Sequence, residues 1–515
     1  MDIGWITRAF QNAGPSGNSS RRAVTFEDGR SWSYQDLHQI SNRYANALAK
    51  FGVEPGARVG IVMQNSLEYV ALYLAITKLG AIAVRINFRL VTEELDYILR
   101  DSSPVVLCLD HSMVDKIAPL ASSLPIQHFF VLAPSNAPRP SWAESWQILD
   151  QGSESDLDYR PNEPDPAMLM YTSGTTGRPK GALWTQGNLL WFSAIQVMRW
   201  QLSGDTVSLM TGPMYHVGAM EDIGLPTLMM GGQVVILRSG QFDIGRVLSM
   251  IKRHHVTDAI LFPFMIYDLL QIENLHPDDL VPLRHIYSGG DPLLPWAIER
   301  LQTHFPHIKL TQVYGLTEGT PIVTSLDSPY DIGHADSVGT PLPLCEVRVA
   351  GDDSQQLQAG ETGEIWSRSP VIAREYWNNP KATEETFQDG WCHTGDLGTM
   401  DKDGLLHVVG RKKDMIRSGG ENIYPVEIED VLMRHPAIRE AAVIGVPDSQ
   451  YLEIVCAVVV LRESTSLSEE EVIAYCREHL AGYKRPRRVK FVPELPRTPS
   501  GKVTKHVLRS HWSIT

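Results

Sequence analysis

The stretch that constrains this chain most is YTSGTTGRPKGA, from Tyr171 to Ala182, because it combines glycines, hydroxyls and one lysine. The apolar run at 167–171 leads into it and predicts a short buried strand. Glycines let the backbone come close to a ligand, and successive exposed N–H groups form a nest for an anion. We therefore predict a loop that holds phosphate groups. Its candidate nucleotide-binding residues are Thr172, Ser173, Gly174, Thr175, Thr176, Gly177 and Lys180.

The spacing within this loop excludes two common phosphate motifs. A P-loop needs a lysine directly after its second glycine, whereas Lys180 follows Pro179, and the G-x-G-x-x-G turn is also absent. Nearly residue for residue, the stretch instead resembles the signature loop of the adenylate-forming superfamily. That superfamily includes acyl-CoA synthetases, peptide-synthetase adenylation domains and luciferases. The resemblance runs from about residue 25 to about residue 510.

Length, charge and cysteines set broader limits. A chain of 515 residues is too long for one hydrophobic core and predicts two or more domains. The formal net charge of -14 argues against nucleic acid as the main partner, because phosphate backbones need a basic face. The five cysteines form no C-x-x-C pair, which fits reduced thiols in a cytoplasmic protein better than disulfides or zinc. We expect no secretory signal and no transmembrane segment, since no apolar run reaches about 18 residues.

Strand-like and helix-like runs alternate along the chain, which favours an α/β fold with parallel sheets. Residues 133–166 are rich in Pro, Ser and Asp and predict surface loop, and short β-like runs within 336–370 predict a small β subdomain. We expect an N-terminal domain over 1–410 with two α/β subdomains and that β subdomain. A hinge at 411–414 and a small, mobile α+β domain over 415–515 should follow.

The sequence YGLTE, from Tyr314 to Glu318, follows a predicted strand at 309–313. A hydroxyl and a carboxylate at a strand end can bind phosphate and a hard cation, since Mg²⁺ takes oxygen ligands. The resemblance implies that Thr317 contacts the α-phosphate of ATP and that Glu318 binds Mg²⁺. It places Tyr314 near the adenine and Gly315 in the same nucleotide-binding turn.

Two further segments are candidates for the acyl pocket. The resemblance makes His216, in PMYHVGAM, a gate beside the acyl group rather than a base. It implies that Gly289, Gly290 and Asp291 cover one face of the adenine and line the pocket. Many fatty-acid members carry a small residue where this chain has Asp291, which argues against a simple fatty acid. Two acids at 221–222 are also unusual in a fatty-acid pocket, and a position facing solvent is one explanation for them.

The C-terminal part carries the remaining candidates. The resemblance implies that Asp396 binds the ribose with help from Arg411, and that Lys413 is the pivot of a hinge. It places Gly419, Gly420 and Glu421 along the pantetheine tunnel of CoA-using members. A basic cluster at 484–490 is a candidate contact for the nucleotide end of CoA, although a solvated face explains it equally well. Lys502 would lie over the reacting atoms and bridge carboxylate and α-phosphate.

Together these motifs imply an ATP-dependent acyl-CoA synthetase, an AMP-forming acid–thiol ligase. A carboxylic acid would attack the α-phosphate of MgATP to give acyl-AMP and pyrophosphate, and the thiol of CoA would then displace AMP. Lys502 would obstruct the thiol, so the small domain should rotate about Lys413 between the two steps. A homodimer is compatible with this function.

Three other functions stay open. An adenylating enzyme could load the phosphopantetheine thiol of a carrier protein, although no carrier domain follows Thr515 and no Asp is seen where peptide-synthetase domains hold an amino group. A luciferase-type oxygenase would share the adenylation half-reaction. A non-catalytic nucleotide-binding protein fits poorly, because Lys180, Glu318, Asp396 and Lys502 are all intact. The acid itself is open among medium-chain, aryl, alicyclic and hydroxy acids.

Overall fold

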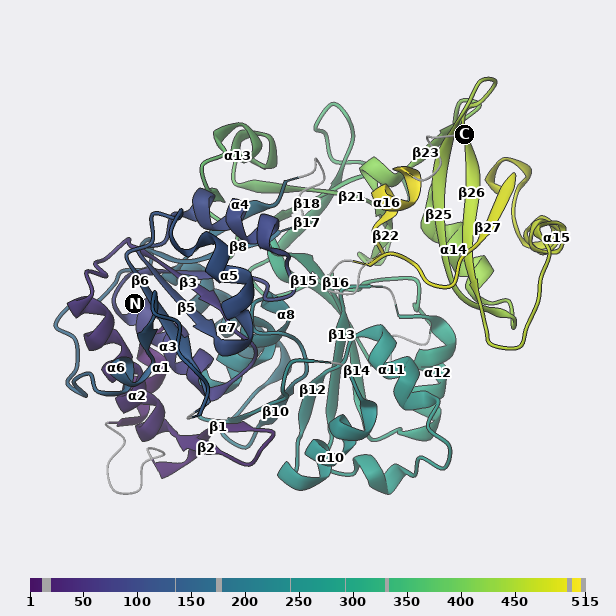
Figure 1. Ribbon diagram of the computed structural model, residues 1–515. Helices are drawn as coiled ribbons and strands as arrows, with labels where there is room; N and C mark the ends of the chain where they lie inside the picture. Colours follow the sequence, from purple (N-terminus) through teal and green to yellow (C-terminus); the bar gives the residue numbers. More distant parts are fainter. Residues whose placement is uncertain are drawn as a thin grey trace. The chain divides into compact units, whose positions relative to one another are not determined.

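The computed structural model describes residues 1–11, 20–134, 136–172, 178–240, 242–291, 293–328, 333–497 and 503–510 (Figure 1). The chain forms two compact units. The first comprises Met1–Val347 and Ser367–His393, and the second comprises Arg348–Trp366 and Thr394–Thr515. The hinge at 411–414 and the domain boundary at Gly410 stay predictions, because the two units do not define a hinge.

The first unit contains two large sheets whose central strands are parallel, which confirms the predicted α/β class. In the eight-stranded sheet, an antiparallel pair of strands, β8 and β9, flanks the parallel strands. In spatial order its strands are β19 (Glu375–Tyr376), β9 (Lys180–Thr185), β8 (Pro166–Thr172), β4 (Ile82–Arg85), β3 (Arg58–Val62), β5 (Val106–Asp110), β6 (His128–Leu132) and β7 (Glu144–Ser145).

The nine-stranded sheet also has a parallel centre with antiparallel strands at both edges. In spatial order its strands are β16 (Thr340–Pro341), β15 (Thr320–Asp327), β14 (Lys309–Leu316), β13 (His285–Gly289), β12 (Asp258–Ile260), β10 (Val207–Met210), β11 (Gln233–Ile236), β1 (Arg22–Phe26) and β2 (Ser31–Ser33).

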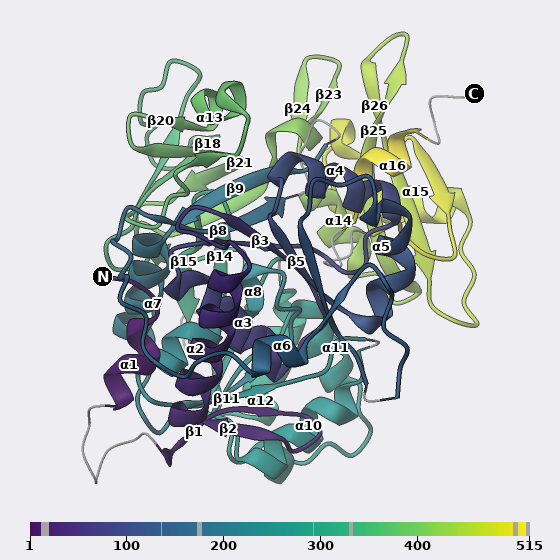
Figure 2. The same ribbon diagram turned by 60° about the vertical axis from the view of Figure 1, so that its left-hand side comes forward.

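Helices cover the sheets on both faces. Between the sheets lie α2 (Tyr34–Lys50), α3 (Leu67–Lys78) and α7 (Gln186–Trp200), whose apolar side chains share one core with both. The outer face of the eight-stranded sheet is covered by α4 (Thr92–Ser102) and α5 (Val114–Ala121) (Figure 2). The outer face of the nine-stranded sheet is covered by α10 (Ile244–His254), α11 (Pro263–Leu270) and α12 (Pro295–His304). Shorter helices are α1 (Trp5–Gln11), α6 (Gln147–Asp150), α8 (Val217–Ala219), α9 (Leu225–Met229) and α13 (Pro380–Thr386).

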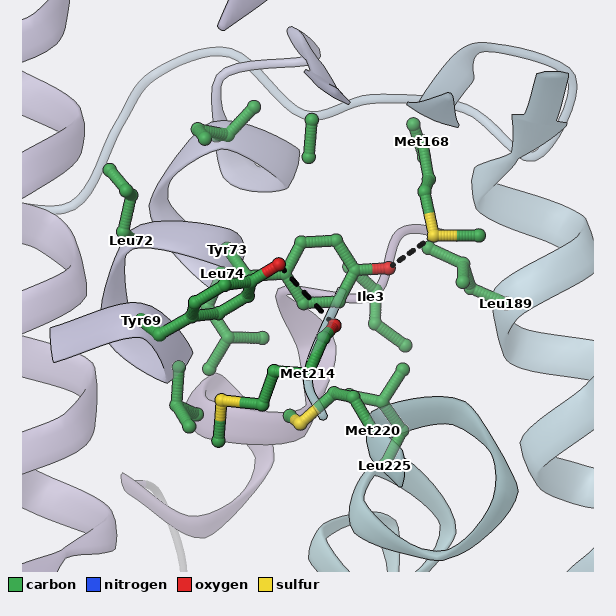
Figure 3. Close-up of a cluster of buried hydrophobic side chains, with 14 of the residues drawn as sticks. Ile3, Tyr69, Leu72, Tyr73, Leu74, Met168, Leu189, Met214, Met220 and Leu225 are labelled. Carbon is green, nitrogen blue, oxygen red and sulfur yellow. Dashed lines mark hydrogen bonds between the residues drawn. The ribbon is translucent and has the colours of Figure 1, made fainter. Parts of the chain in front are cut away.

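The central helices show why these sequences fold as they do. Helix α2 begins with a capping box, in which Ser33 Oγ accepts from Asp36 N at 3.1 Å and Asp36 Oδ2 accepts from Ser33 N at 2.8 Å. Helix α3 is mostly apolar and buried on nearly all sides, as expected of a helix packed between two sheets. In that core, Tyr73 OH lies 3.5 Å from Met168 Sδ and Tyr69 OH donates to Met214 O at 3.3 Å (Figure 3).

The division between the units runs through a five-stranded sheet of β17 (Glu346–Ala350), β18 (Gly363–Arg368), β20 (Phe387–Gln388), β21 (Trp391–Met400) and β22 (Leu406–Arg411). The rest of the second unit is a second five-stranded sheet with helices. Its elements are β23 (Ile416–Ser418), β24 (Glu421–Ile423), β25 (Ile438–Asp448), β26 (Leu452–Leu461), β27 (Arg488–Phe491), α14 (Pro425–Met433), α15 (Glu469–His479) and α16 (Lys505–Ser510).

One expectation about local structure was partly wrong. The segment at 133–166, predicted as surface loop, contains β7 and α6, and Leu149 of α6 is fully buried. The high Pro and Ser content of this segment predicted a loop, although a short helix within it places an apolar side chain in the core. None of the helices in the described parts of the chain is long and apolar enough to cross a membrane.

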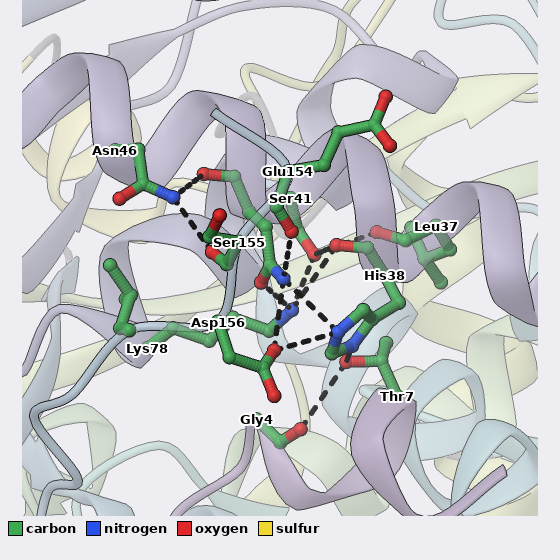
Figure 4. A network of polar contacts seen from close by, with 12 residues as sticks. Gly4, Thr7, Leu37, His38, Ser41, Asn46, Lys78, Glu154, Ser155 and Asp156 are labelled. Atoms are coloured by element: carbon green, nitrogen blue, oxygen red, sulfur yellow. Dashed lines mark hydrogen bonds and ion pairs between the residues drawn. The ribbon is translucent and has the colours of Figure 1, made fainter. Parts of the chain in front are cut away.

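A buried polar network joins α1, α2 and α3 (Figure 4). Lys78 Nζ donates to Ser41 Oγ at 2.7 Å and to Asn42 Oδ1 at 2.9 Å, while His38 Nε2 lies 2.9 Å from Asp156 Oδ1. Lys78 is 3% exposed. Burial, and then the charge of Arg8, lowers the pKa of its ammonium to about 7, against smaller opposing effects of Asp156 and Asp2.

This lysine predicts a pH dependence of stability. Between pH 7 and its ordinary pKa of 10.5, the unfolded chain binds more protons at Lys78 than the folded protein does. The free energy of unfolding should therefore increase as the pH is raised from about 7 toward 10.5. Urea midpoints at pH 7, 8 and 9 should change less in Lys78→Met than in the wild type. The exposed Lys50→Met variant should keep the wild-type slope, and equal slopes in all three proteins would contradict the prediction.

Candidate active site

The predicted site residues of the first unit follow the carboxyl ends of strands. Thr172 ends β8, His216 follows β10, Gly289 ends β13, and Thr317 and Glu318 follow β14. Ligands of α/β proteins bind at the carboxyl ends of parallel strands. Thr172 belongs to the eight-stranded sheet and the other residues to the nine-stranded sheet, so the candidates lie at the ligand-binding edges of two sheets.

The signature loop begins beside Glu318. Thr172 and Lys180 are register partners on β8 and β9, so the loop leaves and re-enters the sheet at one point. Thr172 Oγ1 donates to Glu318 Oε1 at 2.7 Å, and Tyr376 OH donates to the same oxygen at 2.9 Å. The Lys180 ammonium lies 5.0 Å from the centre of the Tyr376 ring. A candidate phosphate loop and a candidate metal ligand, 146 residues apart in sequence, are thus in direct contact. Residues Ser173, Gly174, Thr175, Thr176 and Gly177 lie outside the described part of the chain.

The turn that carries Thr317 and Glu318 is fixed by backbone contacts. Trp184 Nε1 donates to Thr317 O at 3.0 Å, and Ala373 N donates to Glu318 O at 2.8 Å. Gly315 sits at an irregularity between β14 and β15, where an added Cβ would lie 2.1 Å from Thr320 O. Only glycine fits this close approach of two strands, so Gly315 is needed by the turn itself.

The environment of Glu318 fits Mg²⁺. Its Oε1 takes two donors, whereas its Oε2 has no hydrogen-bond partner among the residues that the structure describes. Over the same residues, no group of three or more His, Cys, Asp or Glu could hold a metal ion. Mg²⁺ commonly uses one or two carboxylates together with water and substrate phosphates, which suits a single free carboxylate oxygen.

The candidate acyl segments also converge. His216 Nδ1 accepts from Gly218 N at 3.1 Å, so in the neutral ring the proton sits on Nε2. This hydrogen bond fixes the His216 ring, which fits the predicted gate better than a general base. The Phe262 ring lies 3.3 Å from the position of a Cβ on Gly218 and 3.6 Å from that on Gly290. Asp291, after β13, is exposed.

The expectation that the acids at 221–222 face solvent was wrong for Glu221. Its side chain is 1% exposed and pairs with Arg85, which is itself fully buried. Arg85 also donates to Met214 O, and to His216 O at 3.3 Å. Carboxylates are rarely buried without a cation, and here the partner lies on β4, 136 residues away in the sequence.

In the second unit, Asp396 and Arg411 form an ion pair of 2.7 Å as register partners on β21 and β22. The predicted ribose-binding pair is therefore brought together. Asp396 is buried, and its backbone N–H donates to Thr394 Oγ1 at 3.1 Å. Lys413 is exposed in a 3₁₀ turn at Lys412–Asp414.

Gly419 and Gly420 form the two-residue turn between β23 and β24, with φ of 59° and 89°. A type I′ hairpin turn needs positive φ at both central positions, so the turn itself explains why glycine stands at both. Glu421 follows them and is exposed. In the basic cluster, Lys484 pairs with Glu427 at 2.6 Å and the Arg487 guanidinium lies 4.0 Å from the Tyr451 ring centre. Lys502 lies outside the described residues.

Sequence reasoning missed Tyr376 and Arg85. Tyr376 lies in REYW and Arg85 in AVRIN, and neither sequence is a motif with a chemical meaning of its own. An arginine at the end of an apolar strand was the only signal, because a cation there needs an acid nearby.

The chain matches the family model of the AMP-binding enzyme over residues 11–377, and that of the AMP-binding enzyme C-terminal domain over residues 427–502. The chain belongs to the AMP-binding enzyme family. The predicted resemblance to adenylate-forming enzymes is thereby confirmed.

Relatives with defined names match along nearly their whole length. A feruloyl-CoA synthase of Amycolatopsis sp is 37% identical over 484 residues, which cover 94% of each chain. The ATP-bound crystal structure of MatB from Rhodopseudomonas palustris matches with a TM-score of 0.90 and 32% identity, over 100% of this chain and 99% of MatB. The anthranilate CoA ligase AuaEII, in complex with anthranoyl-AMP, matches with a TM-score of 0.89 and 28% identity, over 99% and 97% of the two chains.

Proposed function

We propose that this protein is an ATP-dependent acyl-CoA synthetase that activates an aromatic carboxylic acid. The contact of Thr172 with Glu318 Oε1 carries the proposal, because it places the phosphate loop beside a carboxylate whose Oε2 can bind Mg²⁺. The predicted class, an AMP-forming acid–thiol ligase, is confirmed by relatives named CoA synthases and CoA ligases. These names favour free CoA over a carrier protein as the thiol acceptor. An aromatic acid is supported by Phe262 beside Gly218 and Gly290, and by the feruloyl and anthranoyl groups of two relatives.

In the first half-reaction two anions, the carboxylate and the α-phosphate, must meet. Groups that place positive charge or N–H donors where negative charge develops can lower this barrier by several kcal/mol, on the order of a 10²–10³-fold effect for one donor. Lys180 and the loop would hold the phosphates that leave, Thr317 the α-phosphate, and Lys502 the reacting oxygens. Bound Mg²⁺ would neutralise phosphate charge, held by Glu318.

In the second half-reaction, the thiol of CoA attacks the carbonyl carbon of the acyl-AMP and AMP leaves. The five cysteines are buried, and all serve as core side chains rather than nucleophiles. Asp396 and Arg411 would hold the ribose, and rotation of the small domain about Lys413 would clear Lys502 from the thiol path. Mg²⁺ dependence, a cytoplasmic location and a homodimer remain predictions.

One experiment tests the function as a whole. The protein is incubated with MgATP, CoA and single acids, including cinnamic, 3-phenylpropanoic, benzoic and octanoic acids, and AMP release is measured. We expect AMP to appear only with both an acid and CoA, with faster rates for aromatic acids. If no acid supports CoA-dependent AMP release, the proposal fails; if octanoic acid is preferred, the aromatic class is wrong.

The role of Glu318 predicts a specific defect. Glu318→Gln keeps the shape but removes the charge that would hold Mg²⁺, so acyl-AMP formation should fall about 10²-fold or more. The concentration of Mg²⁺ needed for half-maximal rate should rise. Acid-dependent pyrophosphate release at varied Mg²⁺ measures both.

The matched control for this variant is Tyr376→Phe, which removes a donor to the same carboxylate without changing its charge. We expect a loss of about tenfold or less from one neutral hydrogen bond, with an unchanged Mg²⁺ requirement. An equal Mg²⁺ requirement in Glu318→Gln and the wild type would exclude the metal role.

A further inference from the structure

Two adjacent acids, Glu221 and Asp222, lie on a π-helical segment (Met220–Gly224) that follows His216 and α8. Single π-turns widen the backbone spiral and occur frequently at functional sites. Here the segment separates the two carboxylates into different environments. Glu221 points to Arg85, and Gln196 Nε2 donates to Glu221 O at 2.8 Å. The Arg85–Glu221 pair is thus a neutral unit.

Asp222 has no such partner. Its Oδ1 is buried and makes no hydrogen bond among the described residues. A Cβ added to Gly218 would lie 3.7 Å from Asp222 Oδ2. The same added atom would lie 3.2 Å from His216 Nδ1 and 3.3 Å from Phe262 Cζ. The carboxyl group therefore lies beside the candidate gate and the aromatic ring, which approach Gly218 so closely that a side chain there would crowd them.

A buried polar atom without a partner costs free energy, about 1–3 kcal/mol for a typical group. A ligand that supplies the missing hydrogen bond would recover this free energy. Gly218 and Phe262 provide apolar surface beside this carboxyl group, and Gly290 lies against the same ring. Asp222 is then the polar group that can distinguish one acid from another.

The protonation state of Asp222 selects the kind of group it can bind. Burial, and next the charge of Glu221, raises the pKa of its carboxyl well above the ordinary range, and Arg85 opposes this only in part. A raised pKa favours the neutral carboxylic acid, which has one donor and one acceptor. A hydroxyl group can satisfy both, whereas an ammonium group would require the carboxyl to ionise beside Glu221.

We propose that Asp222 is a specificity-determining residue of the acyl pocket, and that the acid activated by this enzyme carries a hydroxyl group that hydrogen-bonds to it. The proposal rests on the acyl-CoA synthetase function proposed above. It narrows the substrate class to hydroxylated aromatic acids.

The test uses matched acids that differ in one group. Rates of CoA-dependent AMP release are measured for 3-phenylpropanoic acids that carry a hydroxyl, a methyl or an aminomethyl group at ring position 2, 3 or 4. For at least one position we expect kcat/KM to be about tenfold or more higher for the hydroxyl than for the methyl compound. Asp222→Leu should reduce this ratio to about 1, whereas Asp222→Asn, which also has a donor and an acceptor, should keep it.

Asp268→Leu makes the same change at an exposed position on α11 and should retain the wild-type ratio. A thermal shift with ATP, equal in Asp222→Leu and the wild type, shows that the variant is folded and binds nucleotide. Equal ratios in Asp222→Leu and the wild type, or preference for the aminomethyl acids, would overturn the assignment while the synthetase function stands. If no acid in the panel gives CoA-dependent AMP release, the function and the assignment fall together.

Discussion

Replacing Lys502 by alanine should slow acyl-AMP formation about 10²–10³-fold while thioester formation from supplied acyl-AMP stays nearly unchanged. The reason is that only the first half-reaction brings two anions together. A cation that bridges the carboxylate and the α-phosphate lowers that barrier, and has no similar role once the mixed anhydride exists. Acid-dependent exchange of pyrophosphate into ATP measures the first step, and thioester formation from synthetic acyl-AMP and CoA measures the second.

Lys381→Ala is the control, because its side chain is 87% exposed and lies outside every candidate site. It should leave both half-reactions unchanged. An equal loss of both steps in Lys502→Ala would exclude the bridging role. Thr317→Val offers an independent check, because it removes the hydroxyl proposed to contact the α-phosphate. This variant should also slow acyl-AMP formation and leave thioester formation unchanged.

Much of the fold was predictable because its signals are local. Strand-like and helix-like runs that alternate, as in β3, α3, β4 and β5, predicted the α/β class. The site residues that follow strand ends were predictable for the same reason, since a polar motif after an apolar strand falls at the carboxyl edge of a parallel sheet. Local rules also explain Gly419 and Gly420, whose positive φ is needed by a hairpin turn.

The contacts that the sequence concealed are long-range ones. Nothing near Glu221 indicates that Arg85 neutralises it, because the pair joins β4 to a segment 136 residues later. Likewise, Tyr376 reaches Glu318 across 58 residues from a two-residue strand. Such contacts depend on which strands become neighbours, and a single sequence carries no direct record of that. The error about solvent exposure at 221–222 arose for this reason.

The Arg85–Glu221 pair predicts the largest effect on stability. Arg85→Met removes the cation but leaves Glu221 buried and charged, and breaking one side of a buried pair costs about 3–5 kcal/mol. The free energy of unfolding in urea should fall by that amount. Arg434→Met breaks the exposed pair with Asp430 and serves as control, since such pairs contribute about 1 kcal/mol or less. Equal destabilisation in the two variants would contradict the buried role.

The double variant Arg85→Met with Glu221→Met distinguishes the net contribution of the ion pair to the free energy of unfolding from the cost of leaving one buried charge unpaired. Both side chains begin with an unbranched methylene stem, as methionine does, so methionine can fill part of their space without leaving a charge behind. A buried pair often stabilises little more than apolar residues of the same size, because desolvation offsets most of the attraction. We therefore expect the double variant to regain most of the stability that Arg85→Met loses. If it instead loses the sum of both single changes, the pair acts through packing rather than charge, and its neutralisation of Glu221 beside Asp222 would need another explanation.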